Sequence, residues 1–323
     1  MRKPLPASSV ILMTAFKLMR MLALKYSEPV LKARHARGRM ESILVGNIRR
    51  ALDSAGTGKV PIRKESGVIF VEAGGEEKLV PVLQRIFAID TILIAKRVPL
   101  DESTIFAECV EAAKGFKPKS SFAVRARRAW KHGRSSQELA AMCGGAIFDA
   151  FPRKGLTVDL GSPDNEVFVE IRRDAALISR SMTKGFGGLP VGCEGNAVCI
   201  IDSANSLLAA WLMAKRGMMP VLLVSGRHPT SALEGWLPGL NTERHPTDET
   251  GKRALLESAC SLAEQVGANC VVTGDMFNDI SGKGALSSLD SGLPLPVFRP
   301  LAGFDGKMLA GYLSIFKSGA PKK

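Results

Sequence analysis

The chain contains 323 residues, of which 46% are hydrophobic and 6% aromatic, and it has a formal net charge of +13 and six cysteines. This apolar fraction excludes a chain that is mainly disordered, and no stretch approaches the ~20 apolar residues of a membrane span. Six cysteines without regular spacing do not fit a disulfide-rich secreted scaffold. We therefore expect a cytoplasmic protein of two or three domains, with reduced thiols and no membrane partner.

The charge is distributed unevenly along the chain. Residues 1–190 contain 32 Lys and Arg against 19 Asp and Glu, whereas residues 191–323 contain 12 of each. A positive field of this size attracts polyanions, and nucleic acid or an anionic membrane surface are the usual partners. Basic residues that only solvate a surface would be spread more evenly, so the asymmetry favours nucleic acid.

The basic first half is predicted to form two small α+β units. Residues 1–20 are interpreted as a poorly ordered extension, because Lys17 interrupts the apolar run Val10–Phe16 and no small-residue cleavage site follows. The hydrophobic patterns then predict strands at 21–29, 60–73 (a hairpin), 91–98, 121–130, 156–160 and 166–172, and helices at 31–54, 76–88, 102–114 and 135–150. Five glycines and a proline mark 184–196 as a linker.

The neutral second half has a different pattern, in which continuous apolar strands alternate with helices. Strands are predicted at 197–201, 219–226, 268–275 and 296–301, and helices at 203–216, 249–266 and 306–316. Strands without polar alternation are typical of a sheet that is buried on both faces. This half is therefore predicted to be a doubly wound parallel sheet, with any ligand at the carboxyl ends of its strands.

The sharpest signal in the basic half is the stretch Ser121–Lys131, which reads SFAVRARRAWK. Alternate residues of a strand share a face, so Arg125 and Arg127 point together while Arg128 faces the other way. Such clusters neutralise phosphates, although a solvated edge strand blunted by charge is the alternative. The candidate phosphate-binding residues are Arg125, Arg127, Arg128, Lys131, Lys117 and Lys119, together with Lys32, Arg34 and Arg37 of the first helix.

The first strand-to-helix turn of the second half is the place where a nucleotide-binding enzyme of this topology has a glycine-rich loop. Here the turn Cys199–Leu207 contains no glycine, and Asp202 places a negative charge where an anion would bind. The favoured interpretation is that Asp202 or Ser203 caps the helix. The cysteines are expected to be buried thiols, and the four histidines have no metal-ligand spacing, so no metal site is predicted.

Several ordered motifs between Met21 and the end of the chain are those of a known family. They are KYSE (25–28), FAVRARRAWKHGRSS (122–136), FGGLPVG (186–192), AAWLM (209–213), VTG (272–274) and RPL (299–301). In these motifs the chain resembles the tRNA 4-thiouridine synthetase (tRNA sulfurtransferase) family. The linker motif FGGLPVG is the most specific of them.

The resemblance implies a three-part fold. An N-terminal ferredoxin-like domain would span residues 21–75 and a THUMP RNA-binding domain 76–183. After the linker 184–196, a Rossmann-like domain related to adenine nucleotide α-hydrolases would span 197–323. Full members of the family adenylate a uridine of tRNA with ATP and Mg, and then transfer sulfur through cysteine persulfide chemistry.

The sequence departs from the family where that chemistry lies. The family's Ser-Gly-Gly-x-Asp-Ser loop aligns with residues 201–206, where both glycines are replaced, Asn205 stands for the acid and only Ser206 matches. Lys252 and Gly274 match nucleotide-binding positions, whereas Lys283 stands where a glutamine is usual. The sequence ends before the region of the family's catalytic cysteine.

Two functions are therefore weighed. The favoured one is a tRNA-binding protein that has lost ATP-dependent adenylation and needs no cofactor, with residues 202, 203, 205, 206, 252 and 274 as a degenerate nucleotide site. The alternative is a tRNA 4-thiouridine enzyme with an ATP and Mg site remodelled around Lys252, Gly274 and Asp275, and with sulfur supplied by a partner protein. A homodimer is compatible with either.

Overall fold

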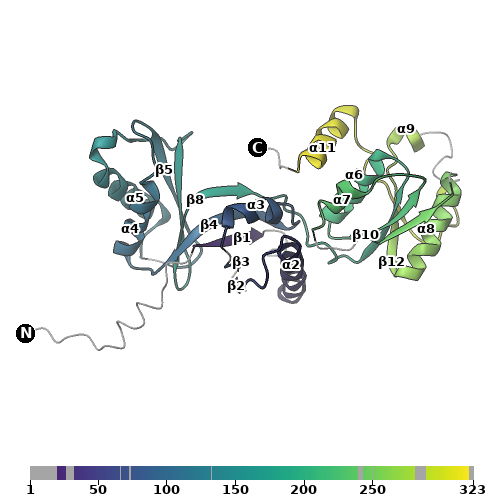
Figure 1. Cartoon of the computed structure of the whole chain (residues 1–323), viewed down its shortest axis with the longest axis horizontal. Coiled ribbons are helices and arrows are strands. Elements are labelled where there is room, and N and C mark those ends of the chain that lie inside the picture. Colours follow the sequence, from purple (N-terminus) through teal and green to yellow (C-terminus); the bar gives the residue numbers. More distant parts are fainter. Residues whose placement is uncertain are drawn as a thin grey trace, which may run out of the picture.

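The computed structural model describes residues 20–26, 33–65, 67–72, 74–131, 133–238, 243–249, 251–280 and 289–319. The predicted N-terminal extension up to residue 19, together with Lys32 and Lys283, lies outside these residues. The described chain is elongated: one sheet with its helices forms one end, a second sheet forms the other, and the linker joins them (Figure 1). In the described ranges, no helix is long and apolar enough to cross a membrane.

The basic half is built on a single eight-stranded sheet, in the order β2-β3-β1-β4-β8-β7-β5-β6. Its strands are β1 (Arg20–Tyr26), β2 (Ile62–Glu65), β3 (Val68–Val71), β4 (Ile89–Val98), β5 (Ser121–Arg128), β6 (Thr157–Val158), β7 (Asn165–Ile171) and β8 (Ala176–Lys184). The two predicted α+β units therefore share one sheet, because β4 pairs with β1 on one side and with β8 on the other.

Strand β8 was not predicted from the sequence, which placed the last strand of this half at 166–172. Its first four residues are buried, and three exposed residues, Arg180, Ser181 and Met182, follow directly. The strand therefore lacks the alternation that marks a strand with one buried face. Since β8 lies between β4 and β7, it is the strand that joins the two units.

Four helices cover this sheet: α2 (Arg34–Ser54), α3 (Glu76–Gln84), α4 (Glu102–Ala113) and α5 (Ser136–Ala150). Helices α2 and α3 share one core with β1 and β3, and α4 and α5 share another with β5 and β7. The predicted helix at 76–88 ends four residues early, since Arg85 and Ile86 donate to carbonyls three residues back, Val82 O and Leu83 O. Ala88 then adopts a left-handed φ of 81°, and its N–H donates to Gly187 O at 2.7 Å. Ser135 and Glu138 form a reciprocal cap at the start of α5.

The linker is packed between the two halves. Phe186, Leu189 and Val191 are buried, and Leu189 N donates to the last turn of α6 at 2.9 Å. Gly188 has a φ of +86°, and a Cβ there would lie 2.4 Å from Lys215 O, so only glycine fits. Glycine in this linker thus permits close packing between the halves.

The second sheet is parallel throughout, in the order β11-β10-β9-β12-β13, as predicted for this half. Its strands are β9 (Asn196–Ile201), β10 (Met219–Ser225), β11 (Arg244–Thr247), β12 (Ala268–Val272) and β13 (Val297–Phe298). The helices are α6 (Ala204–Lys215), α7 (Ser231–Glu234), α8 (Lys252–Val266), α9 (Phe277–Ile280) and α11 (Gly306–Ser318). Strand β11 was not among the predicted strands, because its four residues RHPT are polar or proline and form only an edge. All six cysteines are buried free thiols, as predicted.

Candidate functional site

The turn after β9 is closed by its own side chains. Ser203 caps α6, since its hydroxyl accepts from Ser206 N at 3.3 Å, and the predicted helix cap is thereby confirmed. The Ser206 hydroxyl donates to Asp202 Oδ1 at 2.6 Å and lies 2.9 Å from Ser203 Oγ. Of the backbone N–H groups at the start of α6, that of Ser206 is therefore engaged within the turn, and the Ser203, Ser206 and Asp202 side chains bond to one another. Asn205 lies to one side, with its amide nitrogen 3.9 Å from Met276 Sδ.

Gly274 covers the first turn of α6. A Cβ at this position would lie 2.6 Å from Ser206 N and 2.7 Å from Ser206 Cα, both of them backbone atoms that cannot move aside easily. The loop after β12 is therefore in contact with the helix start. Gly274 is needed for this close packing, independently of any ligand.

Lys252 is held by Asp275 at the same end of the sheet. Lys252 Nζ lies 2.9 Å from Asp275 Oδ1, and Thr273 Oγ1 donates to Asp275 Oδ2 at 2.9 Å. Arg299 approaches Asp275 at 3.4 Å and binds Asp290 with two nitrogens, at 2.8 and 2.7 Å. Burial disfavours the charged form of Asp275, but the hydrogen bonds from Lys252 and Thr273 and the neighbouring cations lower its pKa below the usual range.

The space left at these strand ends is small. A cavity of about 10 Å³ is lined by residues that include Asp202, Lys252, Thr273 and Asp275. A single water molecule needs a cavity of about this volume. The structure thus brings together the predicted residues Asp202, Lys252 and the neighbours of Gly274. Asp202 is already bonded to Ser206, and Lys252 and Thr273 are bonded to Asp275.

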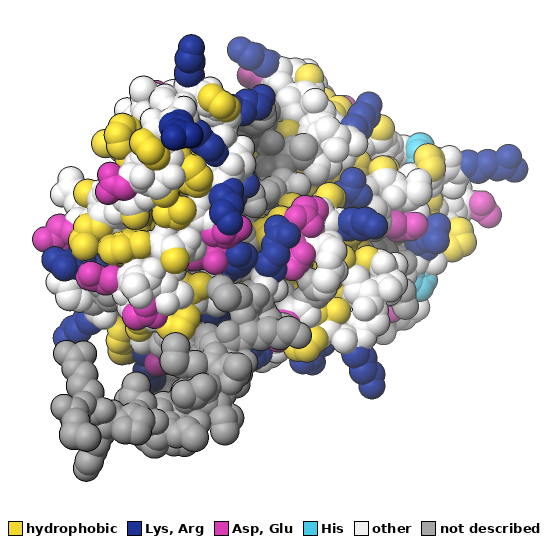
Figure 2. Space-filling view, turned by 60° about the vertical axis from the view of Figure 1, so that its left-hand side comes forward, with side chains coloured by type: hydrophobic (Ala, Val, Ile, Leu, Met, Phe, Trp, Pro, Cys, Tyr) yellow, Lys and Arg dark blue, Asp and Glu magenta, His cyan; other side chains and the backbone are white. Residues whose placement is uncertain are grey.

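A basic surface lies at the far end of β5. Arg127 and Lys131 are exposed there, and Arg128 Nη1 donates to Arg134 O at 3.0 Å. With Trp130, Arg128 and Lys131 line a surface depression of about 480 Å³. Figure 2, in which this end of the molecule comes forward, shows Lys and Arg side chains interspersed with Asp and Glu.

Trp130 is the residue that the sequence reasoning did not select. Its side chain is 51% exposed, and the guanidinium carbon of Arg173 lies 5.6 Å from the ring centroid. An exposed aromatic ring beside cations is the usual platform for stacking on a nucleobase. The signal that could have indicated it was a tryptophan directly after an arginine-rich strand.

The other predicted basic residues are dispersed. Arg125 is paired with Glu166 at 2.8 Å and also donates to Leu160 O at 2.8 Å. Lys117 and Lys119 are exposed before β5 begins, at the opposite end of a strand that spans about 23 Å at roughly 3.3 Å per residue. Arg37 lies on α2, with Nε 3.9 Å from Glu41. The backbone of Arg34 begins α2, and the position of its side chain is not described.

Comparison with known proteins decides the family. The sequence profile of the ThiI ferredoxin-like domain matches residues 21–92, and that of the THUMP domain matches residues 101–180. A probable tRNA sulfurtransferase from Methanosarcina acetivorans is 30% identical over 318 residues, which cover 87% of this chain and 77% of the relative. The chain belongs to the tRNA sulfurtransferase family. A tRNA sulfurtransferase from Pyrobaculum aerophilum is 27% identical, over 89% of this chain and 64% of that protein.

Solved structures give the same fold for this family member. PH1313 from Pyrococcus horikoshii superposes with a TM-score of 0.78 at 26% identity, covering 92% of this chain and 99% of that protein. A 4-thiouridine synthetase–RNA complex with bound ATP superposes with a TM-score of 0.76 at 24% identity, covering 93% and 86%. The predicted ferredoxin-like, THUMP and parallel-sheet folds are therefore confirmed. The boundary predicted at residue 75 stays a prediction, and α3 beyond it packs against β1 and β3.

Proposed function

We propose that this member of the family binds tRNA and does not carry out ATP-dependent adenylation. The observation that carries the proposal is the first turn of α6, where Ser203, Ser206 and Asp202 bond to one another and Gly274 lies against the helix start. A phosphate group binds such a turn through backbone N–H groups at the helix N-terminus, and here the N–H of Ser206 already donates to Ser203 Oγ.

RNA binding is supported by the THUMP domain and by the chemistry of the surface at the end of β5. Arg128 and Lys131 are exposed cations that line one depression with the half-exposed ring of Trp130. Cations neutralise the backbone phosphates while a ring stacks on a base. A solved protein with the same fold is described as a complex with RNA, which makes RNA the partner class that we propose. Because the relatives are tRNA sulfurtransferases, we specify tRNA.

The residues at the strand ends of the second half do not fit ATP. The cavity there is about 10 Å³, which is far below the roughly 300 Å³ of a small-molecule site. Asp202 lines this cavity, where its carboxylate would repel a pyrophosphate, and Lys252, which could neutralise that charge, is paired with Asp275. We therefore propose no cofactor for this domain.

Filter binding of total tRNA at several salt concentrations tests the RNA half of the proposal. Contacts to several phosphates should make the logarithm of the affinity fall linearly with the logarithm of the salt concentration, by about 0.7 to 0.9 per phosphate. Absence of tRNA binding at low salt, or a slope near zero of log affinity against log salt concentration, would contradict the proposal.

The second candidate is an enzyme of tRNA 4-thiouridine formation with a remodelled site. The observation in its favour is that relatives matching 87% and 89% of this chain are named tRNA sulfurtransferases. Lys252, Gly274 and Asp275 would then form the ATP and Mg site, with sulfur supplied by a partner protein. Saturable micromolar ATP binding, together with loss of 4-thiouridine from the tRNA of a deletion strain, would establish this function instead.

A further inference from the structure

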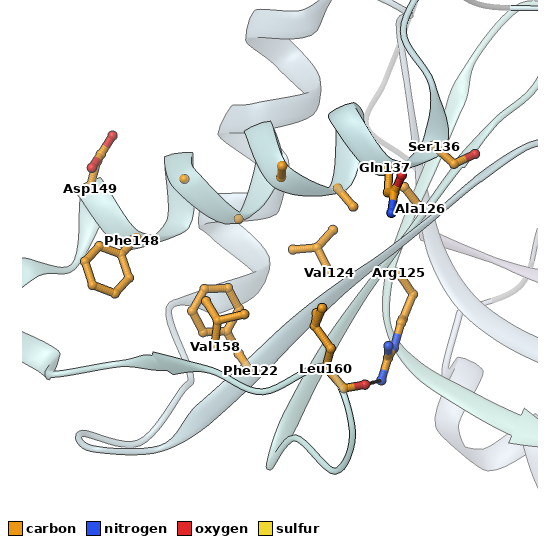
Figure 3. Close-up of a pocket in the computed structure, with 14 residues that line it drawn as sticks. Phe122, Val124, Arg125, Ala126, Ser136, Gln137, Phe148, Asp149, Val158 and Leu160 are labelled. Atoms are coloured by element: carbon orange, nitrogen blue, oxygen red, sulfur yellow. Dashed lines mark hydrogen bonds between the residues drawn. The ribbon is translucent and has the colours of Figure 1, made fainter.

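An apolar groove runs along α5 on the sheet end that contains the basic surface. Its volume is about 730 Å³, and α5 forms one wall while β5, β6 and the chain after β6 form the other. Figure 3 shows Val124, Val158 and Leu160 opposite α5, between Phe148 at one end and Gln137 at the other. Phe148, Val158 and Leu160 are 51%, 61% and 66% exposed. Large apolar side chains exposed together indicate an interaction surface.

The helix wall of the groove is open because it contains two successive glycines. A Cβ on Gly144 would lie 4.0 Å from Val124 Cγ2, and a Cβ on Gly145 would meet no atom within 4 Å. Glycine inside a helix costs about 1 kcal/mol relative to alanine. No contact within the described chain requires glycine at Gly145, so the space above it is available to something outside the chain.

The groove lies beside an open edge of the sheet. Strand β6 pairs only with Ser121 and Phe122 at the beginning of β5. Phe122 O accepts from Asp159 N at 3.1 Å on that side. Within the described ranges, no strand pairs with β5 beyond this point on its outer side.

The direction of the backbone groups follows from the bonds at the two ends of β5. The carbonyl of Phe122 points outward, whereas Ala129 N donates inward to Ile171 O at 2.9 Å. Since successive residues of a strand direct their N–H and C=O groups to opposite sides, Val124 and Ala126 present theirs to the open edge. An edge of this kind is a template for an added strand.

We propose that this edge and groove bind an extended polypeptide segment of a partner protein by strand addition. The segment pairs with the backbone of Val124 and Ala126 and places alternate apolar side chains in the groove below α5. Arg128 and Lys131 are exposed and line the neighbouring depression, which shares Ser136 with the groove. The segment therefore contains a carboxylate at the end that lies nearest to them.

A second copy of this chain fits the edge poorly. An antiparallel pair of β5 strands centred on Ala126 would place Arg125 of each copy opposite Arg127 of the other. Like charges directly opposite one another destabilise a sheet. RNA fits the groove poorly as well, because its walls are mainly apolar and the cation that lines it, Arg125, is paired with Glu166. A peptide with both apolar and acidic residues can place its apolar side chains in the groove and its carboxylate beside the cations.

The probe for the test is a fluorescent nine-residue peptide in which valine or leucine alternates with threonine, with glutamate at both ends. Its control is the same peptide with N-methyl groups on every second residue, which removes the backbone donors that pair with the edge and keeps the side chains. Fluorescence anisotropy with the full chain should give saturable binding of the first peptide. The N-methylated peptide should bind at least about tenfold more weakly, because it loses two or more hydrogen bonds.

The matching protein variant is Gly145→Leu, which fills the groove from a position with no atom within 4 Å and replaces glycine by a better helix former. Gly38→Leu in α2 is the control, since a Cβ there also meets no atom within 4 Å. Gly145→Leu should weaken peptide binding at least about tenfold, and Gly38→Leu should not change it. Equal binding of the two peptides, or unchanged binding by Gly145→Leu, overturns the proposal. If Gly145→Leu instead weakens tRNA binding as strongly, the groove is an RNA site; if tRNA binding is unchanged, the proposed function stands independently of the groove.

Discussion

Replacement of Trp130 by alanine should weaken tRNA binding without changing its dependence on salt. The ring is 51% exposed, and the guanidinium carbon of Arg173 lies 5.6 Å from its centroid. The exposed part of the ring is available to a base. Stacking of one base on an aromatic side chain contributes about 1–3 kcal/mol. The dissociation constant of Trp130→Ala should therefore rise by about 5- to 150-fold. Trp130→Phe, which keeps a ring, should lose much less.

The assay is an anisotropy titration of labelled tRNA at several salt concentrations between about 50 and 200 mM. Lys131→Ala is the comparison, because it removes an exposed cation and should lower the salt slope by about one. Trp130→Ala should instead shift the whole line and keep its slope. The interpretation of this surface is wrong if Trp130→Ala binds like the wild type, or if its effect disappears at high salt.

Two further predictions concern stability. Gly188→Ala should destabilise the chain by about 1–3 kcal/mol more than Gly192→Ala in calorimetric unfolding. Both positions have φ near +90°, but only a Cβ at 188 would meet a backbone oxygen, Lys215 O at 2.4 Å. Equal effects would mean that the linker is loosely packed. The folded chain lowers the pKa of Asp275, so its ion pairs stabilise the protein above the unfolded value of about 4 and this stabilisation is lost as pH falls through the folded value. The melting temperature should therefore fall more steeply below about pH 4 for the wild type than for Asp275→Asn, and parallel curves would show that folding does not lower the pKa of Asp275.

The sequence patterns predicted most helices and strands, and they failed where a pattern was interrupted for a physical reason. The parallel sheet was predictable because its strands are continuously apolar, as in Ala197–Ile201. Strand β8 was not, because its buried residues come first and its exposed residues follow, which leaves no alternation. The linker was predictable from its glycines, but its tight packing was not. Composition cannot distinguish a glycine that allows motion from one that allows a close contact, as Gly188 does.

The candidate sites were predictable to different degrees. Helix capping by Ser203 follows from local spacing, so it was expected and found. The pairing of Lys252 with Asp275 joins residues 23 positions apart and depends on the sheet topology. The exposure of Trp130 and the open edge beside Ala126 are properties of the folded surface. The open edge depends on where β6 ends, after two residues of strand pairing.

Isothermal titration of the full chain with ATP and Mg²⁺ tests the central claim most directly, because it probes the closed turn at the start of α6. The same preparation must first bind tRNA in the filter assay, so that a negative result is obtained with folded protein. The account predicts no saturable heat of ATP binding while tRNA binding is intact. Saturable binding in the micromolar range, abolished by Lys252→Ala, would contradict it.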